Sequence, residues 1–128
     1  MTAATIPTFT EKEALATLKE VVKENPDTVY KAPFHMDPER TGSCFYVHTD
    51  LEGNPMSAGC IVGQVLHRLG VPLEVLKGAE RLSAAGAFNY LGLDPDSRLA
   101  KQLSEVQFQQ DQGVTWEGAY AHAFGKLR

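Results

Sequence analysis

The chain has 128 residues and a formal net charge of −4, with 43% hydrophobic and 22% charged residues. This length and composition fit one globular domain and exclude a disordered chain. The acidic balance argues against a general binder of nucleic acid or of membrane surfaces, because such proteins need a basic patch to hold phosphates. We therefore expect a single domain over residues 1–128, in which residues 1–9 form a loosely ordered tail.

The first expected helix covers about residues 11–24. Thr10 and Glu13 have the spacing of a capping box, and the pair Asn25-Pro26 ends the helix. The start of the chain, MTAATIPTF, has no basic leader, and no apolar run approaches the roughly 20 residues that span a bilayer. We therefore expect a cytoplasmic protein with no membrane partner.

A β-hairpin is expected after this helix. Residues 28–34 are β-like, and residues 43–49 alternate in polarity after a turn-rich interval. The first strand, from Thr28 to Phe34, would lie at an edge, where strand pairing with a second copy would make a homodimer possible. Lys31 and Pro33 would weaken that pairing.

The segment from Asn54 to Gly70 predicts a central helix. Its start could be capped by Ser57, or by Asn54 with Pro55 in the first helical position. Gly59 and Gly63, one turn apart, would let a neighbouring strand or helix approach closely. Apolar residues at helical spacing form the stripe that other elements would cover: Ile61, Val62, Val65, Leu66 and Leu69.

Shorter helices are expected in the second half of the chain. Pro72 can start one that ends at Gly78, and residues 79–91 are rich in alanine. Asp94-Pro95 is expected to cap another, and Thr115 the last. These patterns together predict an α+β fold, mostly helical, with about five helices around the central helix and one β-hairpin.

Four residues are of the types that bind zinc, namely Cys44, His48, Cys60 and His67. Four positions along a strand separate Cys44 from His48 by about 13 Å, and seven along a helix separate Cys60 from His67 by about 10 Å. Zinc needs all its donors within about 2.3 Å. We therefore expect no metal and no cofactor, and we expect both cysteines to be reduced in the cytosol.

A thiol nucleophile is a second possibility. Cys60 would lie in the first turn of the central helix, where backbone amides and the helix dipole lower the pKa of a thiol. His48 or His122 would act as the base, with Asp111 as a further member of the set. Against this, Ile61-Val62 follows at once, which favours a small buried cysteine. A small cysteine-dependent hydrolase or transferase is therefore the alternative function.

A helix-turn-helix is a third possibility, because QVLHRLGVPLEVLKGAERL has a helix, a glycine turn and a second helix. The second helix offers only Lys77 and Arg81 for phosphate contacts, against Glu74 and Glu80. A transcriptional regulator is therefore a second alternative, and nucleic acid is not the expected partner.

Polar residues gather where one expected helix ends, at Gln110 and Asp111, and the next begins, at Trp116. Gln110 could satisfy backbone groups at a strand or helix end, Asp111 could cap the following turn, and Trp116 could fill the core. The same corner could instead form a pocket where it meets Cys60 and Tyr46. The candidate binding residues are Tyr46, Cys60, Gln110, Asp111 and Trp116.

Three runs carry a resemblance to known proteins: Cys44-Phe-Tyr46-Val47, then Cys60-Ile-Val62-Gly63 with Leu66 and Gly70, and finally Gln107-x-x-Gln110-Asp111-x-Gly113-x-x-Trp116-x-x-Ala119. From about Cys44 to Ala123 the chain resembles uncharacterised small proteins of actinobacterial phages and their hosts. It is also similar, more weakly, to actinobacterial domains with a Cys-x-x-Gly-x-Leu helix. The resemblance implies a phage accessory protein or a relative of one. We expect a non-catalytic protein-binding factor whose partner is a host or phage protein.

Overall fold

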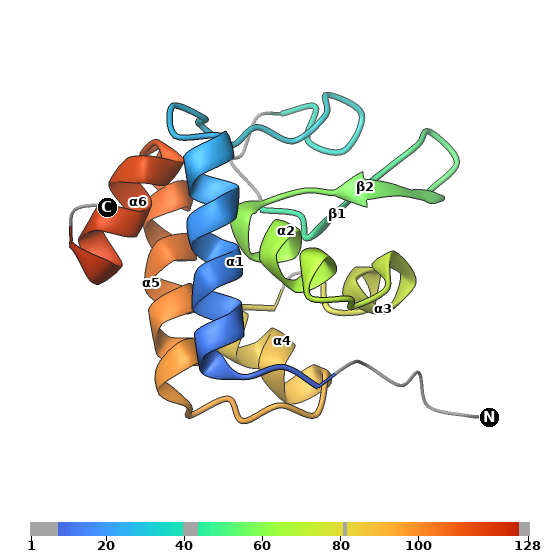
Figure 1. Cartoon of the computed structure of the whole chain (residues 1–128). Coiled ribbons are helices and arrows are strands. Elements are labelled where there is room, and N and C mark those ends of the chain that lie inside the picture. The colour runs from blue at the N-terminus through green and yellow to red at the C-terminus, as the bar shows by residue number, and fades with distance from the viewer. Residues whose placement is uncertain (1–7, 40–43, 81, 126–128) are drawn as a thin grey trace.

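The computed structural model describes residues 8–39, 44–80 and 82–125. In these ranges the chain forms six helices and one two-stranded antiparallel sheet, which confirms the predicted α+β fold (Figure 1). No helix in these ranges is long and apolar enough to cross a membrane. The elements are α1 (Glu11–Glu24), β1 (Val47–Thr49), β2 (Pro55–Ala58), α2 (Ile61–Arg68), α3 (Leu73–Lys77), α4 (Ala84–Tyr90), α5 (Arg98–Asp111) and α6 (Trp116–Phe124).

Helix α1 has the predicted bounds and the predicted cap. The Glu13 amide donates to Thr10 Oγ1, and the Thr10 amide donates to Glu13 Oε1, both at 3.0 Å. This reciprocal pair satisfies two amides that the first helical turn cannot pair by itself. Phe9 packs partly buried against the core, whereas residues 1–7 of the predicted tail lie outside the described residues.

The predicted hairpin was placed wrongly. Its strands are β1 and β2, paired with Val47 opposite Ala58 and with an irregularity after His48, whereas residues 28–34 contain no strand. The reason is a tight turn between β1 and β2, in which Asp50 Oδ1 accepts from the amides of Glu52 and Asn54 at 2.9 Å. This turn closes a local hairpin at a lower entropic cost than a longer loop would.

The segment before β1 is instead held by one side chain from the 28–34 segment. The Phe45 amide donates to the Tyr30 hydroxyl at 3.1 Å, and the same oxygen lies 2.8 Å from His48 Nε2. The two segments are therefore neighbours, but they do not pair as strands. The predicted edge strand from Thr28 to Phe34 is absent, so strand pairing along it does not support a homodimer.

Helix α2 is central, as predicted, but it begins seven residues after the predicted start. It contacts α1, α3, α5 and β2 and lies near the middle of the fold in Figure 1. Cys60 is its N-cap residue, and neither Asn54 nor Ser57 caps it, because residues 55–58 form β2. The pairing continues to the helix start, where the amides of Gly59 and Cys60 donate to the carbonyls of Tyr46 and Phe45. Strand pairing has therefore replaced the first part of the expected helix.

The later helices follow their local signals with two exceptions. Pro72 and Gly78 flank α3, and Thr115 caps α6 by accepting from the Gly118 amide at 3.1 Å, as predicted. Helix α4 is shorter than the predicted 79–91 segment. The cap of α5 is Ser97 and not Asp94-Pro95. Asp94 Oδ1 instead accepts from the Asp96 amide, which makes a turn before the helix.

Candidate functional site

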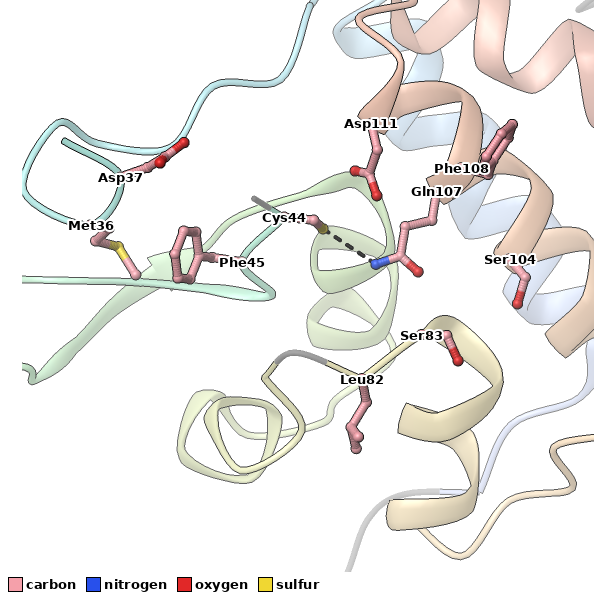
Figure 2. A pocket seen from close by; sticks show the side chains of 10 residues that line it. All are labelled: Met36, Asp37, Cys44, Phe45, Leu82, Ser83, Ser104, Gln107, Phe108 and Asp111. Atoms are coloured by element: carbon pink, nitrogen blue, oxygen red, sulfur yellow. Dashed lines mark hydrogen bonds between the residues drawn. The ribbon is translucent and has the colours of Figure 1, made fainter. Parts of the chain in front are cut away.

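A groove of about 680 Å³ runs beside the C-terminal half of α5 (Figure 2). Its walls come from the loop after α1, from the segment before β1, from the start of α4 and from α5. We call it the α5 groove. Its lining residues are Met36, Asp37, Cys44, Phe45, Leu82, Ser83, Ser104, Gln107, Phe108 and Asp111.

Helix α5 supplies four of these residues from one face. Ser104, Gln107, Phe108 and Asp111 lie at positions i, i+3, i+4 and i+7, which place side chains on the same side of a helix. Leu103 and Val106 point instead into the hydrophobic core. Burial of the core face therefore fixes the rotation of α5 and turns the four other side chains toward the groove.

Gln107 joins three parts of the groove wall. Its Nε2 donates to Cys44 Sγ at 3.3 Å and to the Tyr46 hydroxyl at 3.2 Å. The Tyr46 hydroxyl in turn donates to the carbonyl of Leu82. Burial raises the pKa of Tyr46, against the opposing effect of the Gln107 hydrogen bond, so this phenol remains a proton donor at neutral pH. Figure 2 shows the Gln107 amide and the Cys44 thiol pointing toward each other.

Gln110 lies beneath the groove and is 2% exposed. Its Oε1 accepts from the Ile61 amide at 2.8 Å, in the first turn of α2. Its Nε2 donates to Asp111 Oδ1 at 3.0 Å and lies 3.7 Å from Cys44 Sγ. The prediction that Gln110 satisfies a helix-end backbone group is therefore confirmed. The same side-chain amide also contacts the Cys44 thiol.

Asp111 stands at the groove rim, where its carboxylate accepts from Gln110 and does not cap the following turn. The side chain is exposed, although neighbouring atoms remove part of the water around the carboxylate. This desolvation raises the pKa of Asp111, and the Gln110 hydrogen bond opposes it. Asp111 is therefore an accessible anion whose charged form is imperfectly solvated.

Cys60 does not reach the groove, because it is fully buried at the start of α2. Burial raises the pKa of its thiol, and contact with the Cys44 thiol raises it further. The Gly63 amide lowers the pKa of the Cys60 thiol, although the Cys60 side chain does not cap the helix. The position at a helix start is therefore as predicted, while burial outweighs the effect of the helix amides on the thiol.

We expect Cys60 to be alkylated slowly in the native protein, since the thiolate is the reactive form and this thiol is both buried and protonated. Cys44, partly exposed in the groove, should be labelled first. Peptide mapping after timed iodoacetamide treatment measures both rates. Cys60→Ser should cost roughly 1 to 3 kcal/mol through a poorly satisfied buried hydroxyl. Fast labelling of Cys60 that depends on pH, with unchanged stability of Cys60→Ser, would contradict this assignment.

The remaining predicted residues are dispersed. His48 Nε2 faces the Tyr30 hydroxyl, and burial lowers the pKa of this imidazole, with a smaller effect from His35. His122 lies on α6, in a separate depression of about 540 Å³. The structure therefore does not bring Cys60, His48, His122 and Asp111 together as one catalytic set.

Trp116 is 4% exposed and fills the core, as predicted. Its indole Nε1 has no hydrogen-bond partner among the described residues. Of the candidate binding residues, Tyr46, Cys60 and Gln110 support the groove from beneath, and only Asp111 lines it. Cys44 and Phe108 were missed as site residues, although the spacing of Phe108, Asp111 and Gln107 on one helical face was readable in the sequence.

Glu80 fixes the backbone of Tyr46, the residue directly before β1. Its Oε1 accepts from the Tyr46 amide at 2.6 Å, and its Oε2 accepts more weakly from the Val47 amide at 3.5 Å. Burial raises the pKa of this half-buried carboxyl, and the two backbone hydrogen bonds only partly oppose the shift. The free energy of unfolding should therefore depend on pH through Glu80.

We expect the free energy of unfolding of the wild type, minus that of Glu80→Gln, to fall as the pH rises. The folded-state pKa of Glu80 is raised above 4.5, so near that pKa the folded chain binds more protons than the unfolded chain. The stabilisation from this carboxyl is thus fully present below the unfolded pKa and is lost as the pH rises through the folded pKa. Urea denaturation of both chains at a series of pH values measures the difference. A difference that rises with pH would contradict the assignment.

The segment proposed for DNA recognition forms α3, which has five residues. Lys77 Nζ donates to the carbonyl of Gly53, and Arg81 lies outside the described residues. The geometry of α3 therefore adds no support to the helix-turn-helix alternative.

A second groove, of about 700 Å³, lies between α1 and α6. None of the residues predicted for a site lines it, so the α5 groove is the better candidate. The lining of the second groove is Thr10, Glu11, Lys12, Leu15, Ala16, Lys19, Tyr120 and Phe124.

The α5 groove thus combines a partly buried thiol, amide donors, an accessible carboxylate and apolar side chains. In comparisons with known proteins, no protein-family model, no curated protein and no solved structure matches this chain.

Proposed function

We propose that this chain is a non-catalytic protein-binding accessory factor of the phage type, which holds a segment of a host or phage protein in the α5 groove. One observation carries the proposal. The groove sets two exposed apolar side chains, Phe108 at 55% and Leu82 at 39% exposure, beside the accessible carboxylate of Asp111. An exposed aromatic residue at the edge of a groove is a typical anchor for a bound peptide.

The lining chemistry favours a segment with an apolar side chain next to a lysine or arginine. Among the described lining residues there is no Lys, Arg or His, whereas the exposed carboxylate of Asp111 is present. A cation beside Asp111 would offset the desolvation that raises the pKa of this carboxyl. The net charge of −4 adds a general attraction for basic segments and raises their rate of association.

The cysteine-dependent enzyme has less support. Its proposed nucleophile, Cys60, is fully buried, and burial raises the pKa of the thiol. The partly buried thiol of the groove belongs to Cys44, whose contacts at Sγ are to the amides of Gln107 and Gln110. An amide is not a general base, so these contacts do not activate a nucleophile by proton abstraction.

Selection from a displayed library of linear peptides against the full-length chain tests the proposal. We expect enriched peptides that pair an apolar residue with a lysine or arginine. Phe108→Ala should weaken the best peptide by about tenfold or more. Asp111→Asn should weaken it by about threefold and reduce its dependence on salt.

Met56→Ala is the matched control, because Met56 is an exposed apolar residue on β2 outside the groove lining. It should leave the affinity unchanged. Thermal unfolding of each variant shows whether it remains folded. Equal affinities for all three variants, or no enriched peptide, would contradict the proposal. Turnover of a thioester or amide substrate by the purified chain would favour the enzyme alternative.

A further inference from the structure

The two cysteines of the chain form a pair in which one thiol is accessible and the other is enclosed. Cys44 lines the α5 groove, and Cys60 lies directly behind it at the start of α2, fully buried. Gln110 connects their surroundings, because its Nε2 lies 3.7 Å from Cys44 Sγ and its Oε1 accepts from the amide of Ile61, the residue after Cys60, at 2.8 Å. Both cysteines are free in this structure. They are separated along the chain by the whole β1–β2 hairpin.

The backbone keeps this pair together. The Cys60 amide donates to the carbonyl of Phe45 at 2.8 Å, and the Gly59 amide donates to the carbonyl of Tyr46 at 2.9 Å. These bonds place the segment that follows Cys44 alongside the segment that ends at Cys60. The pairing places Phe45, the residue after Cys44, opposite Cys60. Disulfide formation needs the two α-carbons to lie within about 7 Å, so Cys44 is one residue away from the position directly opposite its proposed partner.

The groove gives small molecules access to the Cys44 sulfur. Gln107 Nε2 donates to Sγ at 3.3 Å, and Gln110 Nε2 lies 3.7 Å from the same atom. Peroxides oxidise cysteines that they can reach, and of the two cysteines Cys44 lines the groove whereas Cys60 is fully buried. The groove, at about 680 Å³, admits a small hydroperoxide to this atom.

We propose that Cys44 is a site of reversible oxidation by small hydroperoxides and that Cys60 is its resolving thiol. The Cys44 thiolate attacks the terminal peroxide oxygen, the O–O bond breaks, and an alkoxide or hydroxide leaves and takes up a proton. Cys44 is then a sulfenic acid. The Cys60 sulfur attacks the Cys44 sulfur, the S–O bond breaks, and the Cys60 proton leaves with the oxygen as water. The product is a Cys44–Cys60 disulfide, formed with the net reduction of one hydroperoxide.

This inference does not rest on peptide binding in the groove. Treatment of the reduced full-length chain with hydrogen peroxide tests it, followed by alkylation of the remaining thiols and mass spectrometry. We expect a loss of about 2 Da, a peptide that links Cys44 to Cys60, and recovery of both thiols with dithiothreitol. This measurement on the wild type requires no variant to fold.

Two variants separate the steps. In Cys60→Ala, the Cys44 sulfenic acid should persist and react with a 1,3-diketone such as dimedone. In Cys44→Ala, peroxide should oxidise Cys60 at least about tenfold more slowly than it oxidises Cys44 in the wild type. Dimers linked through Cys44 with Cys60 still reduced, or overoxidation of Cys44 without a bond to Cys60, would overturn the assignment of Cys60. Absence of any reaction at Cys44 would overturn the whole proposal.

Discussion

Replacing Gly63 with alanine should destabilise the protein by about 2 to 4 kcal/mol. An added Cβ would lie 2.9 Å from both the carbonyl carbon and the Cα of Tyr46, and closer still to the Tyr46 oxygen. The Tyr46 backbone cannot easily move away, because its carbonyl accepts from the Gly59 amide at 2.9 Å and its amide donates to Glu80 at 2.6 Å. The close approach of α2 to the strand therefore depends on the missing side chain.

Urea denaturation measures this effect, and Gly86→Ala provides the control. Gly86 also lies inside a helix, but there the nearest atom to an added Cβ is the Leu82 Cβ at 3.2 Å. The gain in helix propensity, about 1 kcal/mol, should roughly offset that tighter contact. If Gly63→Ala were as stable as the wild type, α2 and the Tyr46 backbone could not be packed this closely.

Replacing Gln110 with alanine should also destabilise the protein by about 2 to 4 kcal/mol. The change removes the acceptor of the buried Ile61 amide and leaves a cavity under the groove. Gln110→Met keeps most of the volume and removes only the hydrogen bonds, so it should cost about 1 to 3 kcal/mol. The difference between the two variants separates the cavity from the unpaired amide.

Gln109→Ala is the matched control on the same helix. Gln109 donates to Glu105 on the surface, so its replacement should change the stability by no more than about 0.5 kcal/mol. Hydrogen exchange at the Ile61 amide adds a local measurement, since this amide should lose protection in both Gln110 variants. Unchanged protection at Ile61 in a folded Gln110→Ala chain would show that the first turn of α2 does not need this acceptor.

Short-range signals in the sequence were sufficient for several elements. The capping box of α1 involves Thr10 and Glu13, which are three residues apart, and the Thr115 cap of α6 reaches only to Gly118. Pro72 likewise starts α3 through its own backbone preference. In each case the groups that decide the structure lie within one or two helical turns, so the sequence contains all the partners.

Where two local signals competed, only the tertiary structure decided between them. Ser57 and Asn54-Pro55 are good helix starts, yet residues 55–58 pair with β1 and the helix begins at Ile61. Residues 54–58 are compatible with both a helix start and a strand. Their sequence does not show that β1 will be beside them to form the strand hydrogen bonds. The Ile61 amide at the helix start is instead satisfied by Gln110, which is 49 residues away from it.

The features of the site also divide into those with local causes and those with long-range causes. The sequence by itself determined that Gln110, Asp111 and Trp116 lie at one corner between two helices, because the helical period and the Thr115 cap are local. Only the tertiary structure decided that Gln110 reaches Ile61, that Asp111 faces the groove, and that the accessible thiol is Cys44 and not Cys60. The physical reason is that exposure of a side chain depends on which other elements cover it, and those elements are distant in the chain.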